Sequence, residues 1–462
     1  MRREQKIRKG NCPEKDRLEA ESYPGERSMA LRETGAKDGG DLLERILERN
    51  NLNDAYRQVR RNGGAPGVDG MSVDDLLAYL HEHKESLLES LRNGTYRPLP
   101  VRRVEIPKPD GGVRLLGVPA VMDRMIQQAI SQVLSPIFEP EFSETSYGFR
   151  PGRSAHQAIR KAQEYYKQGY RQVVDIDLSK YFDTINHELL MGMLRRKISD
   201  HRVLSLIKRY LKSGVMINGM VSATDEGSPQ GGNLSPLLSN IYLTAFDREL
   251  ERRGHKFVRY ADDVNIYVKS RRAAERVLAS SRKFLEAKLK LKVNETKSMA
   301  GSPLKLKFLG FALRSTTKGQ AGIRVHEKSI DRFKSKVREL TRRNQGKSVE
   351  YMLNKLRQYT IGWLGYYAIA DMKSFMQSAG EWMRRKIRTY VWKQWKRVRT
   401  KFDRLQELGI PKGKAWEWAN TRKGCWRIAD SWILHRALNN QRIAEMGYDD
   451  VLLRYNALHS NY

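Results

Sequence analysis

Four aspartates on two short apolar segments are the side chains best suited to chemistry in this sequence. Asp262 and Asp263 are adjacent between two apolar runs, a pair that is ordinary when it stands alone at a turn. Asp175 and Asp177 alternate with apolar residues, so a strand would place both on one face. Two carboxylates at ~4 Å repel by about 4 kcal/mol at an effective dielectric of roughly 20. A hard divalent ion with oxygen ligands, above all Mg²⁺, relieves this repulsion, and two such ions suit phosphoryl or nucleotidyl transfer.

Short strands must position these aspartates. The alternation of apolar residues predicts a strand over 172–177 and two strands joined by a tight turn over 257–268. Residues 101–118 predict a β-hairpin, because the run Pro-Asp-Gly-Gly at 109–112 separates two alternating segments. Helical spacing of apolar residues is found in several other segments, including the basic stretch beyond residue 328. This mixture predicts an α+β fold.

The charge balance points to a polyanionic partner. The 462 residues include 86 Lys and Arg against 53 Asp and Glu, a formal net charge of +33. We expect nucleic acid, since neutralising phosphates releases counterions; the alternative is a merely basic or ribosome-associated protein. Residues 331–400 alone hold 18 Lys and Arg against 5 Asp and Glu. Aromatic residues are interleaved with these cations, and two roles stay open for them, packing in a core or stacking on bases.

Cysteine content and hydropathy limit the cellular compartment and the kinds of partner that we expect. Cys12 and Cys425 are the only cysteines, which excludes a disulfide framework and a Cys-rich zinc module and predicts a reducing, cytoplasmic location. No apolar run approaches the ~20 residues of a membrane helix, so we expect no membrane partner. Residues 1–40 are polar without an apolar period and predict a disordered tail.

Several ordered motifs carry a resemblance to a known family. Residues 260–263 (Tyr-Ala-Asp-Asp) resemble the polymerase signature of reverse transcriptases, and residues 177–183 resemble their first catalytic motif. Residues 226–236 (Glu-Gly-Ser-Pro-Gln-Gly-Gly-Asn-Leu-Ser-Pro) are similar to the nucleotide-binding motif. Further similarities are to the primer grip at 308–311 and to group II intron-encoded proteins at 147–151 and 362–367. From about Leu42 onward, the sequence resembles group II intron-encoded reverse transcriptases and maturases.

The resemblance implies a right-hand polymerase-like α+β fold. Fingers and palm with an antiparallel sheet would be followed by a helical thumb and a small C-terminal DNA-binding segment. Because Cys425 has no paired cysteine near it, the sequence resembles the compact subclass that lacks an endonuclease domain. The implied divisions are a tail (1–40), a helical extension (41–95), fingers and palm (96–324), a thumb or maturase domain (325–404) and the DNA-binding segment (405–462).

The resemblance also implies a site, residue by residue. Asp177 and Asp263 would ligate two Mg²⁺ ions, Asp262 would assist, and Asp175 would be structural. Phe182 would lie under the sugar of the incoming nucleotide and favour dNTPs; the alternative for Phe182 is a plain core aromatic. The remaining implied nucleotide-binding residues are Lys108, Arg114, Gln230 and Lys297. The implied primer grip is Phe308, Leu309, Gly310 and Phe311.

The implied function is RNA-directed DNA polymerisation, with dNTPs added to a primer 3′-hydroxyl. The implied partners are an RNA template with a DNA primer, target DNA and a group II intron RNA whose splicing and mobility the protein assists. An alternative is an RNA-binding splicing cofactor with little polymerase activity. Another alternative keeps the chemistry in a retron, diversity-generating or defence-associated reverse transcriptase. An RNA-dependent RNA polymerase is disfavoured by Phe182 and the Tyr-Ala-Asp-Asp motif.

Overall fold

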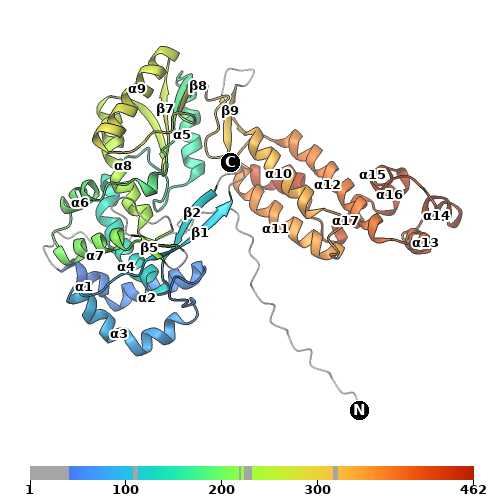
Figure 1. Ribbon diagram of the computed structural model, residues 1–462. Coiled ribbons are helices and arrows are strands. Elements are labelled where there is room, and N and C mark those ends of the chain that lie inside the picture. The colour runs from blue at the N-terminus through green and yellow to red at the C-terminus, as the bar shows by residue number, and fades with distance from the viewer. Residues whose placement is uncertain (1–40, 108–112, 218–219, 223–230, 316–320) are drawn as a thin grey trace. The chain divides into compact units, whose positions relative to one another are not determined.

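The computed structural model describes residues 41–107, 113–217, 220–222, 231–315 and 321–462. The chain divides into two compact units that meet between Ala321 and Gly322 (Figure 1). The predicted tail, 1–40, lies outside the described residues.

The first unit combines helices with two four-stranded sheets. Its helices are α1 (Leu42–Leu47), α2 (Arg49–Asn62), α3 (Leu76–Arg92), α4 (Val121–Phe138), α5 (Ala155–Lys167), α6 (His187–Arg195), α7 (His201–Lys212), α8 (Ser235–Arg252) and α9 (Arg271–Lys288), with the 3-10 turns η1 (Glu139–Glu141) and η2 (Tyr181–Asp183). Its strands are β1 (Val101–Pro107), β2 (Val113–Val118), β3 (Gln172–Ile176), β4 (Val215–Ile217), β5 (Met220–Ser222), β6 (Lys256–Tyr260), β7 (Asp263–Val268), β8 (Met299–Gly301) and β9 (Phe311–Ser315). The predicted α+β class is confirmed.

One sheet, in the order β6-β7-β3-β8, carries the aspartates. All of its neighbouring strands are antiparallel. Tyr260 pairs with Asp263, so β6 and β7 form a hairpin with a two-residue turn. The strands predicted over 172–177 and 257–268 are confirmed.

The two faces of this sheet differ in chemistry because its side chains alternate. Val174, Ile176 and Ile266 lie on the face that joins the main hydrophobic core, where α8 and α9 also bury their apolar residues. Asp175 lies on the other face, opposite Asn265 on β7. Helix α5 packs on that face, where the rings of Tyr165 and Tyr267 are 5.5 Å apart. The carboxylates therefore lie on the side of the sheet away from the main core.

The other sheet has the order β2-β1-β4-β5. The predicted hairpin over 101–118 is confirmed, with β1 and β2 antiparallel and Ile106 opposite Arg114. Strand β1 also pairs in parallel with β4.

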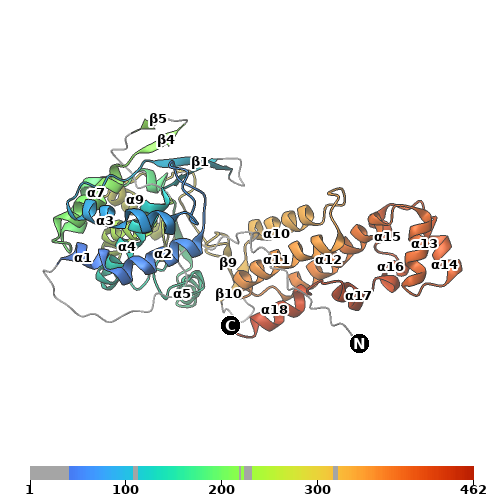
Figure 2. The same cartoon turned by 90° about the horizontal axis from the view of Figure 1, so that it is seen from below.

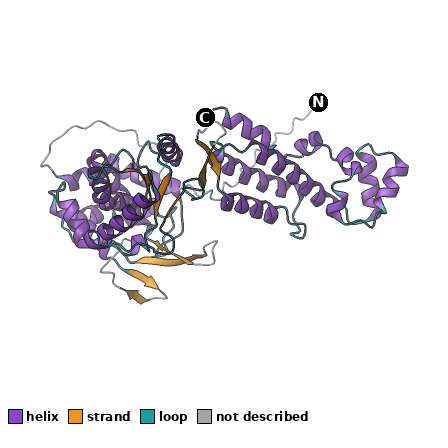
Figure 3. Cartoon of the chain, turned by 90° about the horizontal axis from the view of Figure 1, so that it is seen from above, coloured by secondary structure: helices purple, strands orange, loops and turns teal. Residues whose placement is uncertain are grey.

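Among the residues that the structure describes, the second unit is helical apart from strand β10 (Ala321–Val325) (Figure 3). Helices α10, α11 and α12 lie side by side (Figure 2). The helices of this unit are α10 (Glu327–Leu340), α11 (Val349–Tyr367), α12 (Lys373–Gln394), α13 (Val398–Glu407), α14 (Lys412–Ala419), α15 (Cys425–Ile428), α16 (Trp432–Ala437), α17 (Asn440–Glu445) and α18 (Val451–His459).

Aromatic packing holds α10 to α11 and α12. The ring of Phe333 lies 4.6 Å from that of Trp363 and 5.9 Å from that of Phe375. Trp392 is 2% exposed. For Trp363 and Trp392, a packing role is therefore favoured over stacking on bases. No helix in the described part of the chain is long and apolar enough to span a membrane.

Candidate active site

The register of β3 and β7 brings the two aspartate segments together. Ile176 pairs with Val264, so the next step of the same register places Asp177 beside Asp263. One pair earlier, the Oδ1 of Asp175 accepts a hydrogen bond of 3.0 Å from the side-chain amide of Asn265. Asp175 is thus hydrogen-bonded within the sheet, whereas Asp177 and Asp263 lie just beyond the last residues that pair β3 with β7.

Crowding of negative charge raises two pKa values. Burial, followed by the charges of Asp262, Asp175 and Asp177, raises the pKa of Asp263 to about 7. Because Asp263 keeps substantial exposure to solvent, we attribute the direction mainly to the three neighbouring charges. Burial and the charge of Asp177 raise the pKa of Asp175 to about 6, while the hydrogen bond from Asn265 opposes this rise. The four carboxylates therefore form one electrostatic cluster.

The cluster fits a divalent cation shared with a substrate. Within the described ranges, no three His, Cys, Asp or Glu side chains form a ready metal site. Mg²⁺ commonly takes one or two carboxylates and completes its coordination with water and substrate phosphates. Asp177, Asp262 and Asp263 are the side chains that would hold such an ion, and the raised pKa of Asp263 reflects the negative charge it would neutralise.

Asp177 is fixed through its backbone. Its N–H donates to the hydroxyl of Ser298 at 3.0 Å, and its carbonyl accepts from the N–H of Asn294 at 2.8 Å. The same loop places the Nζ of Lys297 3.9 Å from Asp177 Oδ2, with the lysine side chain 58% exposed. Lys297 thus lies beside the carboxylate cluster, and its contact with the triphosphate stays a prediction.

A buried arginine supports the turn that carries the other two aspartates. The Arg259 guanidinium donates to the carbonyl of Ala261 at 3.0 Å and to Asn240 Oδ1 at 2.8 Å. It also forms a fully buried ion pair with Asp247, with a closest approach of 2.6 Å. Removing either partner would leave a charge without compensation in the interior. The network therefore restrains the backbone immediately before Asp262.

The same turn contacts a glycine from a distant segment. Ala261 has a left-handed backbone, with φ of 55°. A Cβ added to Gly148 would lie 2.3 Å from the backbone nitrogen of Ala261, so only glycine permits this approach. The side chain of Asn240 donates to the carbonyl of Gly148 at 2.9 Å. Gly148, Asn240 and Arg259 thus fix the turn from two sides.

Sequence reasoning did not single out this supporting network or Lys307. Arg259 was visible as a lone cation in an otherwise apolar strand, and Gly148 lies within the quoted 147–151 segment. Neither signal identifies a partner. Lys307, next to the proposed primer grip, lowers the pKa of Asp263 and is thus a further cation near the cluster.

The other proposed site residues are distributed along the first unit. Phe182 is half-buried in η2, its ring 5.2 Å from that of Tyr181. In the proposed primer grip, Phe308 and Phe311 exchange two backbone hydrogen bonds of 2.9 Å, while Leu309 and Gly310 have positive φ.

The nucleotide-binding candidates are only partly described. The backbone of Arg114 lies on β2, while Lys108 and Gln230 lie outside the described residues. After Gln230, a Cβ on Gly231 would meet the carbonyl oxygen of Gly117 at 2.4 Å. The segment after Gln230 therefore packs closely against strand β2, and the nucleotide-binding role of this motif stays a prediction.

Family comparisons agree with the fold of both units. Residues 106–313 match the family described as reverse transcriptase (RNA-dependent DNA polymerase). Residues 330–409 match the maturase-specific domain of group II introns. The fold and site therefore define a reverse transcriptase followed by a maturase-specific domain, and this family generally uses divalent metal ions.

Individual proteins similar to this chain include curated relatives and a solved complex. The chain is 39% identical over 297 residues to Protein YkfC of Escherichia coli K12, an alignment that covers 56% of this chain and 78% of YkfC. It is 31% identical over 331 residues to the group II intron-encoded protein LtrA of Lactococcus lactis subsp. cremoris, covering 57% of this chain and 55% of LtrA. A solved Cas6-RT-Cas1–Cas2 complex aligns with a TM-score of 0.35 and 25% identity, over 54% of this chain and 27% of that chain. The chain belongs to the group II intron-encoded reverse transcriptases and maturases.

Proposed function

We propose that this chain is an RNA-directed DNA polymerase that extends a DNA primer on an RNA template with dNTPs. The observation that carries the proposal is the register that places Asp177 beside Asp263, on a turn shared with Asp262. Four clustered carboxylates would be unfavourable in a protein that only binds RNA. Their mutual repulsion would destabilise the fold, and RNA binding would bring no cation that offsets it.

Each proposed site residue has its own role in nucleotide addition. Asp177, Asp263 and Asp262 would hold two Mg²⁺ ions, which when bound would supply charge neutralisation for phosphoryl transfer. Lys297 and Arg114 orient the triphosphate, and Phe182 packs under the sugar. The turn of residues 308–311 positions the primer end. Positioning supplies much of the rate, so the backbone restraints on Asp177 and on the 260–263 turn are part of the mechanism.

The second part of the proposal is binding of a group II intron RNA to assist splicing and mobility. It rests on the maturase-specific match over 330–409 and on the cationic surplus of residues 331–400. We propose residues 325–404 as the thumb or maturase domain and 405–462 as the segment that binds target DNA. A splicing cofactor with little polymerase activity is the second candidate, and the retained Asp177, Asp262 and Asp263 disfavour it.

The decisive experiment is primer extension on an RNA template with dNTPs and Mg²⁺, with Asp263→Asn measured in parallel. We expect full-length cDNA from the parent and none from the variant. RNA binding by both proteins serves as the control for folding. If neither protein makes cDNA while both bind RNA, the polymerase proposal fails and the splicing cofactor becomes the better description.

A further inference from the structure

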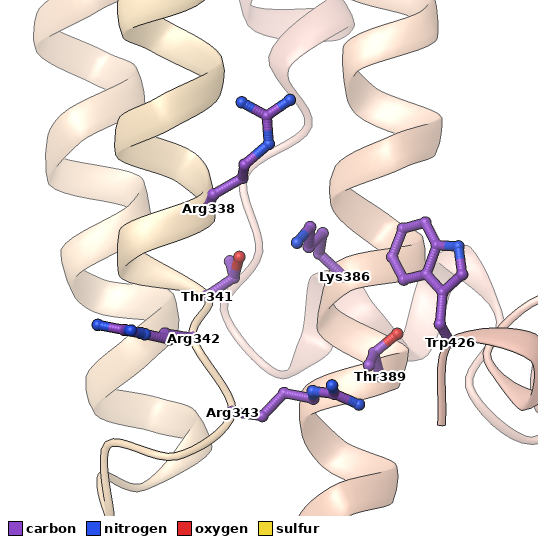
Figure 4. Close-up of a pocket in the computed structure, with 7 residues that line it drawn as sticks. All are labelled: Arg338, Thr341, Arg342, Arg343, Lys386, Thr389 and Trp426. Atoms are coloured by element: carbon purple, nitrogen blue, oxygen red, sulfur yellow. The ribbon is translucent and has the colours of Figure 1, made fainter. Parts of the chain in front are cut away.

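A cavity of about 310 Å³ lies in the second unit, apart from every residue assigned to catalysis above. Side chains from the C-terminal end of α10 and the loop after it, from α12 and from α15 line the cavity (Figure 4). Four of them are cationic and one is an indole, and two threonines complete the wall. The charged and aromatic members are Arg338, Arg342, Arg343, Lys386 and Trp426.

The cations around this cavity have no acidic partner in the part of the chain that the structure describes. Among the described residues, no carboxylate pairs with any of the four, although two carboxylates lie on neighbouring segments. Glu339 pairs with Lys336 at 2.7 Å, and Asp430 pairs with Arg385 at 3.1 Å. Burial, together with the charges of Arg338 and Arg343, lowers the pKa of Lys386. This crowding of positive charge is relieved by an anion inside the cavity.

Two indoles hold Lys386 at the cavity. Its Nζ lies 5.5 Å from the ring centroids of both Trp382 and Trp426. The Trp426 ring is held in turn by Arg385, whose guanidinium lies 4.2 Å from the ring centroid and donates to the Trp426 carbonyl at 3.1 Å. Cation–π contacts of this kind hold a cation in place without neutralising its charge. Lys386 is therefore positioned in advance for an anionic ligand.

We propose that this pocket binds a backbone phosphate of the intron RNA, an inference that rests on the maturase part of the proposed function. RNA is the favoured source because Arg338, Arg342, Arg343 and Lys386 all fall within the maturase-specific match over 330–409. Trp426 comes from outside that match and is 40% exposed, which leaves ring surface for a neighbouring base. The pocket thus joins the matched domain to the segment that follows it.

Salt-dependent binding of a labelled single-stranded RNA tests the proposal, with DNA of the same sequence as the second probe. The pocket variant is Lys386→Met, which keeps an unbranched stem between the indoles. The matched control is Arg272→Met, which removes an exposed cation of α9 outside the 331–400 stretch. We expect Lys386→Met to weaken RNA binding about 5- to 10-fold at moderate salt and to lower the slope of log K against log salt by roughly 0.7 to 1. Arg272→Met should change affinity less than about 2-fold.

Three outcomes would overturn the proposal. Unchanged RNA affinity in Lys386→Met removes the pocket from binding, and equal losses in Lys386→Met and Arg272→Met show diffuse attraction instead of a site. A larger loss for DNA than for RNA assigns the pocket to DNA. Arg343→Met is the second variant should Lys386→Met fold poorly, because Arg343 is exposed. The experiment measures no dNTP addition, so the polymerase proposal and this one can fail separately.

Discussion

The carboxylate cluster of the first unit and the cationic pocket of the second present the same electrostatic situation with opposite sign. In the first, burial together with Asp262, Asp175 and Asp177 raises the pKa of Asp263. In the second, burial together with Arg338 and Arg343 lowers the pKa of Lys386. A ligand of the other sign would stabilise each group of like charges, a divalent cation in one case and a phosphate in the other.

The two regions differ in how their charged atoms are held. Asp177 is fixed by backbone hydrogen bonds, and the turn before Asp263 is fixed by a fully buried ion pair and a glycine contact. The pocket cations stand on helices and a loop, and three of them are exposed arginines. We infer that the carboxylate cluster depends on atomic position, whereas the three exposed arginines of the pocket contribute mainly their charge.

The largest effect is expected from Asp177→Asn. An amide keeps the shape of the side chain but removes the charge that a divalent ion requires, so nucleotide addition should fall at least about 10³-fold. Steady-state primer extension measures this loss, and Asp74→Asn, at an exposed position, is the control. Activity within 10-fold of the parent would remove Asp177 from the site.

Arg259→Met tests the buried support of the turn. The change leaves the Asp247 carboxylate in the interior without a partner, which we expect to cost about 3–5 kcal/mol of unfolding free energy. Urea unfolding measures the loss, and Arg252→Met is the control because that side chain is 71% exposed. Adding Asp247→Leu to Arg259→Met should recover part of the stability, and a further loss would contradict this account.

The sequence predicted the strands around the aspartates because their signal is local. Asp175 and Asp177 alternate with Val174 and Ile176, so the face they share could be predicted without knowing any partner strand. The support of the turn could not be predicted in this way, since Gly148 approaches Ala261 from a segment more than a hundred residues earlier. That contact depends on tertiary packing, which leaves no periodicity in the sequence.

The cationic pocket shows the same limit. The surplus of Lys and Arg over 331–400 predicted a binding surface for a polyanion. It did not predict a cavity, because Trp426 enters from beyond that stretch. The surplus also did not show which cations lack a carboxylate partner, since Lys336 and Lys386 look alike in sequence while only Lys336 is paired with Glu339. Pairing is decided by the fold.

Gly148→Ala tests whether activity depends on the position of the clustered carboxylates as well as on their charge. The added methyl would lie 2.3 Å from the Ala261 nitrogen, so the turn must move, although every carboxylate remains. A misplacement of the reacting groups by about 1 Å can lower the rate of a positioned reaction on the order of 10²-fold. Primer extension measures the effect, and Gly192→Ala is the control because its added Cβ meets nothing within 4 Å. Equal activity of the two variants would show that the turn tolerates movement.

The pH dependence of stability gives a smaller effect. The folded-state pKa of Asp263, about 7, lies above the ordinary value of 3.8. The stabilisation from this carboxyl is therefore complete below pH ~4 and is lost as the pH rises through ~7. Asp263→Asn lacks this loss, so in EDTA its Tm should exceed that of the parent by a margin that grows from about pH 5 to about pH 8.

Two comparisons make the pH experiment specific. The pKa of Asp123 is also raised, to about 6 by burial, but Asp123 is present in both proteins and cancels in the difference. Added Mg²⁺ should stabilise the parent more than Asp263→Asn and so reduce the margin, because a bound cation removes the like-charge repulsion. A margin that is constant with pH would contradict the assignment of the raised pKa to Asp263.

The smallest effect is expected from Arg343→Lys. Arg343 is exposed, and no ion pair with a described carboxylate fixes the orientation of its guanidinium. If the pocket responds to charge alone, lysine should keep RNA affinity within about 2-fold, while Arg343→Met should lower the salt slope by roughly 0.7 to 1. Equal losses in the two variants would show that the guanidinium contacts phosphate through paired hydrogen bonds, which lysine cannot reproduce. The pocket would then depend on atomic position as the carboxylate cluster does.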